Sequence, residues 1–234
     1  MGISKHVCIA LFGGTGERFG APYPKQFVTL GDEPMLIVTL RGLSRCVDID
    51  EIYVVAEPSS RDDVYNLILA KQVKKVKAIL KGGPTRQDSA RLALEFLKRS
   101  GTPNDAIVMI ADGDRPCVDP DLVHRCYAYA EEVGASVAAI PMSESVLCSQ
   151  DGKRVSAYLD RSTVYTVQTP QTFLFSLIYA AHQKFKKRPV TDDASLVSLM
   201  HKPIAIVPGN KENIKITVPE DVAQYLAWKA KRKA

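Results

Sequence analysis

Several classes of protein are excluded by what this sequence has little of. Only 14 of its 234 residues are glycine, which is far too few for a collagen-like chain. The longest apolar stretches, such as residues 106–111, fall well short of the roughly 20 residues needed to cross a bilayer. Hydrophobic residues still make up 46%, more than a disordered chain contains. The sequence therefore predicts a globular protein without a membrane partner, with a core large enough to support a rigid site.

Cysteine and histidine are also scarce, and neither forms a metal-binding pattern. The five cysteines lie far apart and include no C-x-x-C pair, which argues against a disulfide framework and a structural zinc site. The four histidines form no H-x-x-x-H pair. The first residues run into a strand-like segment without a secretory hydrophobic region. We therefore expect a cytoplasmic protein.

The charge balance is mildly positive. Lys and Arg number 31 against 26 Asp and Glu, a formal net charge of +5, which suits a small polyanionic substrate as well as a nucleic acid. Basic residues gather at the C-terminus (Lys229, Lys231, Arg232 and Lys233), where charge runs are typical of solvated tails. Because no stripe of basic and aromatic residues occurs, we expect no nucleic-acid partner.

Short β-branched runs alternate with amphipathic segments along most of the chain. Near-continuous apolar strands are typical of a sheet whose two faces are both covered by helices. The order predicts an α/β protein with a mostly parallel, Rossmann-like sheet that binds ligands outside the carboxyl ends of its strands. The predicted strands cover residues 6–12, 51–56, 76–80, 106–111 and 135–140, and the predicted helices cover 34–46, 59–71, 86–100 and 120–133.

The alternation breaks after residue 140. A proline, a polar stretch and a short alternating segment, with Asp151-Gly152 as a turn, predict a protruding β-hairpin arm over residues 141–165. Because an arm of this length is too short to be a domain, we expect a single domain over residues 1–234. The rest of the chain is predicted to form helices at 173–187 and 193–200, strands at 204–207 and 214–217, and a final helix from Pro219.

A glycine-rich loop follows the first predicted strand. It contains Gly13, Gly14, Thr15 and Gly16 and is followed by two long cations, Arg18 and Lys25. Backbone N–H groups of such a loop can approach phosphate oxygens closely. The P-loop pattern is absent because Lys25 stands between Pro24 and Gln26, and the dinucleotide fingerprint fails because Phe19 replaces its third glycine. The loop suits a nucleoside triphosphate with a leaving pyrophosphate, although a plain turn with surface cations remains the alternative.

Further polar groups follow other predicted strands. Asp112 and Asp114 come directly after residues 106–111; carboxylates there can hold Mg²⁺, and the adjacent Arg115 suits phosphate. A simple Asp/Gly turn is the alternative. Gly82 and Gly83 also follow a strand and can pack against a base, and additional groups occur at 160–161, 168–171 and 213–215. Their coincidence near one rim of a sheet indicates a ligand site.

Six motifs in fixed order carry a family resemblance. They are GGTGERFGAPYPKQF, GGPTRQDS, DGDRP, VQTPQTF, TDDAS and NIKITVPED, and the resemblance spans about residues 6–225. With them the sequence resembles the family of 2-C-methyl-D-erythritol 4-phosphate and ribitol-5-phosphate cytidylyltransferases. The resemblance implies a nucleotidyltransferase fold and Mg²⁺-dependent transfer of a cytidylyl group from CTP to a small polyol phosphate. It also implies a homodimer in which the arm crosses to the partner.

The resemblance assigns a role to each matching residue. Arg18 and Lys25 would be catalytic, stabilising charge on the α-phosphate and the departing pyrophosphate, and Asp112 would hold Mg²⁺. The residues implied for CTP are Gly13, Gly14, Thr15, Gly16, Gly82, Gly83 and Ser89. The residues implied for the acceptor are Arg115, Ser145, Arg161, Thr169 and Lys215, some of them from the partner chain.

The chain departs from the family pattern at three places. The family commonly reads HDAARP where this chain reads ADGDRP, so Asp114 is an extra carboxylate. Pro84 replaces a common acidic residue, and Glu144-Ser145 replaces Asp-Thr on the arm. Two of these changes concern the acceptor side. Methylerythritol phosphate is the expected acceptor, and ribitol 5-phosphate or another pentitol phosphate is the alternative.

Two other classes of function fit the sequence less well. A non-catalytic nucleotide-binding module should have lost the cations, yet Arg18, Lys25, Arg115, Arg161 and Lys215 are all present. A Rossmann oxidoreductase is disfavoured by the broken dinucleotide fingerprint.

Overall fold

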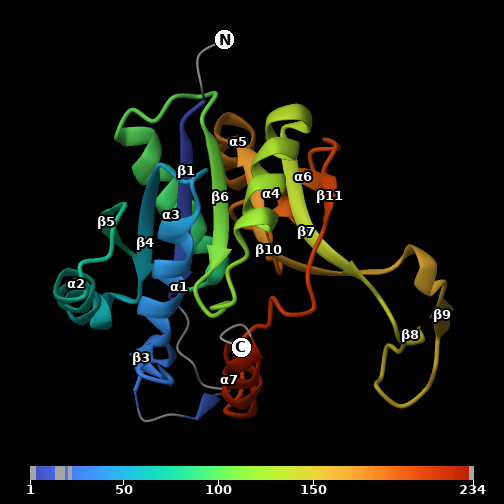
Figure 1. Ribbon diagram of the computed structural model, residues 1–234. Coiled ribbons are helices and arrows are strands. Elements are labelled where there is room, and N and C mark those ends of the chain that lie inside the picture. Colours follow the sequence, from blue (N-terminus) through green and yellow to red (C-terminus); the bar gives the residue numbers. More distant parts are fainter. Residues whose placement is uncertain (1–3, 14–18, 21–22, 232–234) are drawn as a thin grey trace.

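The computed structural model describes residues 4–13, 19–20 and 23–231. A seven-stranded sheet in the order β11-β7-β10-β6-β1-β4-β5 forms its centre (Figure 1). Every neighbouring pair is parallel except those of β10, which runs antiparallel to β6 and β7. The mostly parallel α/β sheet is therefore confirmed. The strands are β1 (His6–Phe12), β4 (Glu51–Ala56), β5 (Val76–Lys81), β6 (Ile107–Asp112), β7 (Ala135–Pro141), β10 (Tyr165–Leu174) and β11 (Ala205–Pro208).

Helices cover both faces of this sheet. Alternate residues of β1 show why: Ile9 packs into one core cluster with Leu94 and Phe175, while Ala10 packs into another with Leu40 and Val123. A strand buried on both sides has no polar face to present, which explains the continuous apolar runs. The helices are α1 (Met35–Arg45), α2 (Arg61–Ala70), α3 (Arg86–Arg99), α4 (Pro120–Val133), α5 (Phe175–Lys184), α6 (Ala194–Ser198) and α7 (Glu220–Lys231).

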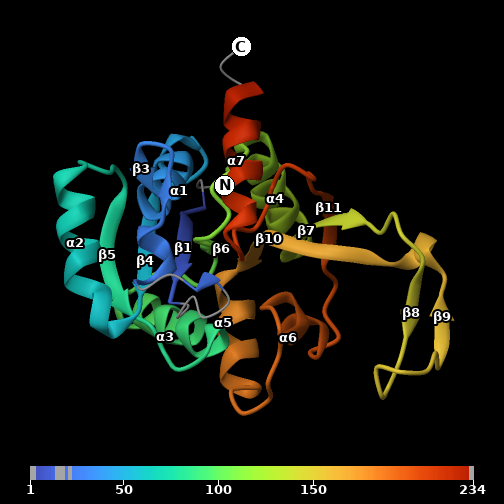
Figure 2. The same cartoon turned by 90° about the horizontal axis from the view of Figure 1, so that it is seen from below.

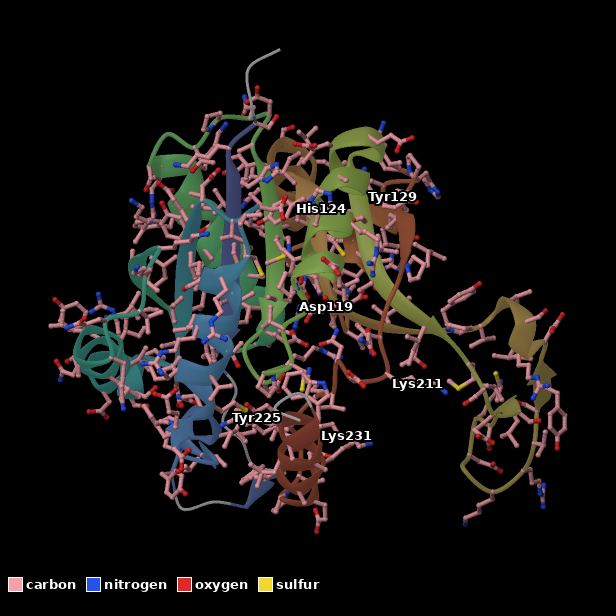
Figure 3. All side chains as sticks on the ribbon, viewed as in Figure 1. Asp119, His124, Tyr129, Lys211, Tyr225 and Lys231 are labelled. Carbon is pink, nitrogen blue, oxygen red and sulfur yellow. The ribbon has the colours of Figure 1, made fainter. Side chains whose placement is uncertain are left out.

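Two helices that follow the carboxyl ends of strands, α3 and α4, are capped by side chains. Thr85 accepts a hydrogen bond from the Asp88 backbone N–H at the start of α3. Asp119 does the same for the Asp121 N–H at the start of α4, where Figure 3 labels it. These caps satisfy N–H groups that the first helical turn leaves unpaired. They fix where the first turn of α3 lies relative to the sheet.

The structure corrects the bounds of one predicted helix and replaces one predicted strand. The helix predicted over 173–187 spans Phe175–Lys184, because Phe173 and Leu174 belong to β10. The sequence did not predict β10 as a strand because it contains Pro170, and proline has no N–H to donate to a neighbouring strand. The pairing of β10 with β7 is interrupted around this proline, between Val167 and Gln171.

The strand predicted over 214–217 is a loop instead. Its alternation arises because Ile216 is buried in a separate cluster with Leu30, Met35 and Tyr225. The alternation of apolar residues therefore arises from packing against α7 and not from pairing in a sheet. Tyr225 and Lys231 on α7 are labelled in Figure 3, and Lys231 is exposed.

The arm, residues 141–165, projects from the sheet in both views (Figures 1 and 2). It contains a hairpin of β8 (Val146–Cys148) and β9 (Ala157–Leu159) and a 3-10 helix, Arg161–Thr163. The Asp151 carboxylate accepts the backbone N–H groups of residues 153 and 154, which closes the turn. Among its exposed apolar side chains are Tyr158, 71% exposed, and Val155, 53% exposed.

The remaining elements are short. β2 (Thr29–Leu30) pairs with β3 (Glu33–Pro34), and 3-10 helices cover Lys25–Phe27 and Pro58–Ser60. None of the helices within the described ranges has the length and apolarity needed to cross a bilayer.

Candidate active site

The carboxyl ends of β1, β5 and β6 lie along one edge of the sheet, called here the carboxyl edge. Gly13 follows β1, and Gly82 and Gly83 follow β5. The Gly83 N–H donates to Ser89 Oγ at 3.0 Å, and a Cβ added at Gly13 or Gly82 would stand 3.2 Å from the same oxygen. The glycines therefore let two loops close around the Ser89 hydroxyl, so the structure places Gly13, Gly82, Gly83 and Ser89 together.

Asp112 ends β6 and is the centre of the edge. Its Oδ1 accepts from Arg86, with Nε and Nη2 both at 3.0 Å. Its Oδ2 accepts from Lys215 Nζ at 2.8 Å and lies 3.7 Å from Arg115 Nε. The Asp112 backbone N–H donates to Thr169 Oγ1 at 3.1 Å. Three residues from distant parts of the sequence, Arg86, Thr169 and Lys215, thus converge with the nearby Arg115 on Asp112.

The surrounding cations keep Asp112 ionised. Burial opposes the charge, but Arg86, Lys215 and Arg115 outweigh it and hold the pKa of the Asp112 carboxyl at about 2. Burial also opposes the charge of the neighbouring Arg115. Here burial outweighs the attraction of Asp112 and Asp114, so the pKa of Arg115 is lowered. The Asp112 carboxylate is therefore an anion at neutral pH, available to cations.

Asp114 forms a second carboxylate centre two residues further on. Lys25 Nζ donates to its Oδ2 at 2.6 Å and to the Ile216 carbonyl at 2.8 Å. The Ile216 N–H in turn donates to the Asp114 carbonyl at 2.8 Å. These contacts hold Lys25 at the edge, and they make Asp114 part of the site.

The loop between the two carboxylates requires a glycine. A Cβ at Gly113 would overlap the Phe12 ring, and the Gly113 carbonyl accepts from Thr39 Oγ1 at 2.9 Å. The ring of Phe12 thus occupies the space of a side chain at position 113. This packing accounts for the glycine in ADGDRP, where the family pattern has alanine.

The carboxyl edge gathers most of the predicted site residues that the structure describes. Lys25, Arg115, Thr169 and Lys215 surround the two carboxylates. Gly14, Thr15, Gly16 and Arg18 lie outside the described residues.

Ser145 and Arg161 are not at the edge. Both lie on the arm, which projects away from it (Figure 2). Arg161 donates to the Ser143 carbonyl at 3.2 Å, within the arm itself. A role for these two residues at this chain's own carboxyl edge therefore has no contact to support it among the described residues.

Sequence reasoning missed three residues behind Asp112. Arg86 also donates to Asp193, with Nη1 2.6 Å from Oδ2, and His182 Nε2 lies 3.0 Å from the other Asp193 oxygen. A signal was present: Arg86 belongs to GGPTRQDS, and Asp193 belongs to TDDAS, a motif to which no site residue was assigned. Nothing in the sequence places the two motifs side by side.

The two carboxylates can accommodate a divalent cation. Within residues 4–13, 19–20 and 23–231, no group of three or more His, Cys, Asp or Glu side chains could ligate a metal. Mg²⁺, however, is usually held by only one or two carboxylates together with substrate phosphates. Asp114 Oδ1 is a buried acceptor with no hydrogen-bond partner, 3.9 Å from Lys215 Nζ. Asp112 and Asp114 thus fit a Mg²⁺ ion that is completed by substrate.

Comparison with known proteins identifies the family. The family model described as "IspD: 2-C-methyl-D-erythritol 4-phosphate cytidylyltransferase" matches residues 6–228. A Geobacillus kaustophilus protein of that name is 36% identical over 228 residues, 97% of each chain. The Lacticaseibacillus paracasei ribitol-5-phosphate cytidylyltransferase is 32% identical over 226 residues, covering 94% of this chain and 96% of the relative.

Solved structures agree in fold. The 4-diphosphocytidyl-2C-methyl-D-erythritol synthase of Anaerococcus prevotii superposes with a TM-score of 0.83 at 27% identity, covering 97% of this chain and 96% of that one. The 2-C-methyl-D-erythritol 4-phosphate cytidylyltransferase of Francisella tularensis gives 0.81 at 26% identity, covering 97% and 100%. With nearly the whole chain matched, and the motif residues gathered on one edge of the sheet, this protein belongs to the IspD family of cytidylyltransferases.

Proposed function

We propose that this protein transfers the cytidylyl group of CTP to the phosphate of a sugar alcohol and releases pyrophosphate. The preferred acceptor in this proposal is 2-C-methyl-D-erythritol 4-phosphate, the substrate in the names of most of the matched relatives. The supporting observation is the cluster of Lys25, Arg86, Arg115 and Lys215 around Asp112 and Asp114 at one sheet edge. The cytoplasm is the proposed location, because widely spaced cysteines favour a reducing compartment.

The chemistry needs no general base. An oxygen of the acceptor phosphate attacks the α-phosphorus of CTP, a new phosphorus–oxygen bond forms, and the bond to the leaving pyrophosphate breaks. A phosphate monoester is already largely ionised at neutral pH, since its second pKa is about 6. The difficulty is the repulsion between two polyanions, and fixed cations directed at the developing charge reduce it.

Lys25 is the described cation best placed to serve the nucleotide. Two short contacts, to Asp114 and to the Ile216 carbonyl, restrain its Nζ before substrate arrives. In the proposal Lys25 and Arg18 stabilise the α-phosphate and the pyrophosphate. The loop residues Gly13, Gly14, Thr15 and Gly16 donate to the phosphates, and Gly82, Gly83 and Ser89 line the cytidine.

The acceptor phosphate is assigned to the other side of Asp112. Lys215 and Arg115 both approach Asp112 Oδ2, and Thr169 holds the backbone of the same residue. Arg161 and Ser145 would complete this half-site from the arm of a second copy of the chain. The exposed apolar side chains of the arm support a homodimer, because a hairpin of this size gains stability by packing against another surface.

The proposed metal is Mg²⁺, held by Asp112 and Asp114. When bound, it would neutralise part of the triphosphate charge. The protein's own part is to present two ionised carboxylates beside the phosphate-binding cations. The low pKa of Asp112 keeps that carboxylate charged throughout the physiological range.

Ribitol 5-phosphate is the second candidate acceptor. The Lacticaseibacillus paracasei relative carries that substrate in its name. Asp114 and Ser145, which depart from the common family pattern, lie in the loop and the arm assigned to the acceptor side.

Pyrophosphate release with CTP and Mg²⁺ tests the proposal against methylerythritol phosphate, ribitol phosphate and other pentitol phosphates. We expect release only when CTP and an acceptor are both present, with the highest kcat/KM for methylerythritol phosphate. A higher value for ribitol phosphate would replace the acceptor and keep the reaction. No release with any acceptor would refute the function.

A further inference from the structure

Two sequence motifs meet behind the carboxyl edge through one side chain. Arg86, from GGPTRQDS, directs Nε and Nη2 to Asp112 Oδ1, both at 3.0 Å. Its Nη1 reaches Asp193 Oδ2, from TDDAS, at 2.6 Å. The planar guanidinium presents its donors in a fixed fork. A single arginine therefore joins the carboxylate of the proposed active site to a second carboxylate inside the protein.

Asp193 is anchored from every side. It is 1% exposed, and its other oxygen lies 3.0 Å from Nε2 of the fully buried His182. Its backbone N–H and that of Ala194 donate to Gln171 Oε1 at 3.1 and 2.9 Å. Displacing Asp193 would leave several buried polar groups unpaired, which is strongly unfavourable. The buried Asp193 carboxylate thus holds the Arg86 guanidinium in place, although Asp193 itself does not lie at the carboxyl edge.

The opposite oxygen of Asp112 is held far less firmly. Oδ2 accepts from Lys215, whose side chain is 36% exposed and lies on the loop before α7. A lysine is a point charge on a flexible stem, whereas an arginine fork is geometrically constrained. Lys215 also has a second carboxylate, Asp114, 3.9 Å away. Arg115 Nε also faces Oδ2, but its distance of 3.7 Å is longer than a hydrogen bond. The two oxygens of Asp112 therefore differ: Oδ1 is held by an anchored arginine fork, and Oδ2 is hydrogen-bonded to a lysine that can turn away.

We propose that Arg86 is a positioning residue of the transfer site, with Asp193 and His182 acting through it. Its clamp on Oδ1 orients the Asp112 carboxylate and would leave Oδ2 available to a divalent cation once Lys215 moves away. Lys215 is thereby released to a substrate phosphate. This inference rests on the proposed function, and it assigns a role to Arg86 that neither the family motif nor the relatives' names supply.

The direct test is Arg86→Lys, which keeps the positive charge but cannot span both carboxylates. We expect the Mg²⁺ concentration that gives half-maximal pyrophosphate release to rise about 10–100-fold, as for residues that orient metal ligands. The matched control is Arg91→Lys. Arg91 lies on the same helix, α3, and also bridges two carboxylates, Asp88 and Glu95. The control should keep the wild-type Mg²⁺ dependence.

A binding measurement separates positioning from loss of stability. Calorimetry with CTP, with and without Mg²⁺, gives the factor by which Mg²⁺ tightens CTP binding. We expect Arg86→Lys to lose most of that factor while retaining a cooperative thermal transition. Asp193→Asn should show the same loss. If the Asp193 variant does not fold, the result for Arg86→Lys decides alone.

The outcomes are distinct. If Arg86→Lys keeps the wild-type Mg²⁺ half-saturation and the wild-type gain in CTP affinity, the inference is overturned, even if kcat falls. If wild-type protein releases no pyrophosphate with any acceptor, the proposed function fails. The calorimetric comparison of wild type, Arg86→Lys and Arg91→Lys would then still decide whether Arg86 controls the metal site.

Discussion

The carboxyl edge and the arm both carry residues assigned to the acceptor, yet they are built in opposite ways. At the edge, Asp112 is 8% exposed and each of its oxygens contacts a cation. On the arm, Arg161 is exposed and donates to a backbone carbonyl of the same arm. The edge is organised within one chain before any substrate binds. The arm is organised only as a hairpin, so its side chains need another surface to become part of a rigid site.

The comparison also separates two kinds of contribution to catalysis. Four cations contact three carboxylates at and behind the edge, which leaves one positive charge in excess for anionic substrates. The cations are Lys25, Arg86, Arg115 and Lys215, and the carboxylates are Asp112, Asp114 and Asp193. Such preorganised charge lowers the barrier of the chemical step. A cation brought in on a projecting hairpin contributes to binding of the group that stays in place. The following experiments test whether the nucleotide-side cation Lys25 sets kcat, while the acceptor contacts, Lys215 at the edge and Arg161 on the arm, set KM.

The largest expected effect is at the edge. Lys25→Ala should lower kcat about 10²–10³-fold, since it removes one preorganised contact to the transition state, and Arg18→Ala should do the same. Pyrophosphate release at saturating substrates measures it. Lys77→Ala is the control, because Lys77 lies on the outer strand β5, where it pairs with Glu51 of β4. Wild-type kcat in the Lys25 variant would contradict the proposal that Lys25 stabilises the transition state.

A mixing experiment tests whether the arm serves a second chain. Lys25→Ala and Arg161→Ala damage different halves of the proposed site, so a heterodimer has one fully wild-type site. Co-expression and random pairing should restore about a quarter of wild-type activity. The assay uses an acceptor concentration well below the KM of the Arg161 variant, at which each variant alone stays low. If co-expression gives no more than the mean of the two variants, the arm acts on its own chain or not at all.

The acceptor contacts come next in size. Lys215→Ala at the edge and Arg161→Ala on the arm should each raise the KM for the acceptor. The rise should correspond to a loss of about 1.5–3 kcal/mol of binding free energy, as expected for a charged hydrogen bond. The KM for CTP should change less, because these groups hold the phosphate that is not transferred. Steady-state kinetics with each substrate varied in turn measures both. A fall in kcat alone in either variant would contradict the assignment.

The smallest effect concerns stability at acid pH. The pKa of Asp112 lies at about 2 in the folded chain, below its ordinary value of 3.8. A carboxyl with a lowered pKa stabilises the fold fully above its unfolded pKa and loses this contribution as the pH falls through the folded value. We expect about 2 kcal/mol to be lost between about pH 4 and pH 2, measured by denaturant unfolding.

Asp112→Asn should flatten that part of the stability curve. Asp151→Asn is the matched change on the arm, where the carboxyl is fully exposed, and it should alter the curve little. An equal flattening in both variants would show that the edge carboxylate is not specially stabilised by its cations.

Local patterns predicted much of this fold. The strands β1, β4, β5, β6 and β7 follow from apolar runs that require cover on both faces, and Asp112 and the glycines were placed at their ends. β10 was missed because its residues between Val167 and Gln171 include Pro170, and its pairing with β6 and β7 depends on segments distant in sequence. Arg86 was missed for the same reason, since its anchor Asp193 lies 107 positions away.

The order of strands and helices, the hairpin and the family are determined by the sequence, because periodicity, turns and motifs are local properties. Only the tertiary structure decided which charges meet. Lys25 contacts a carbonyl 191 positions away, and Asp112 takes its partners from α3 and from the loop before α7. The pairing of charges depends on where packing of the core brings the strand ends, and no local pattern encodes that.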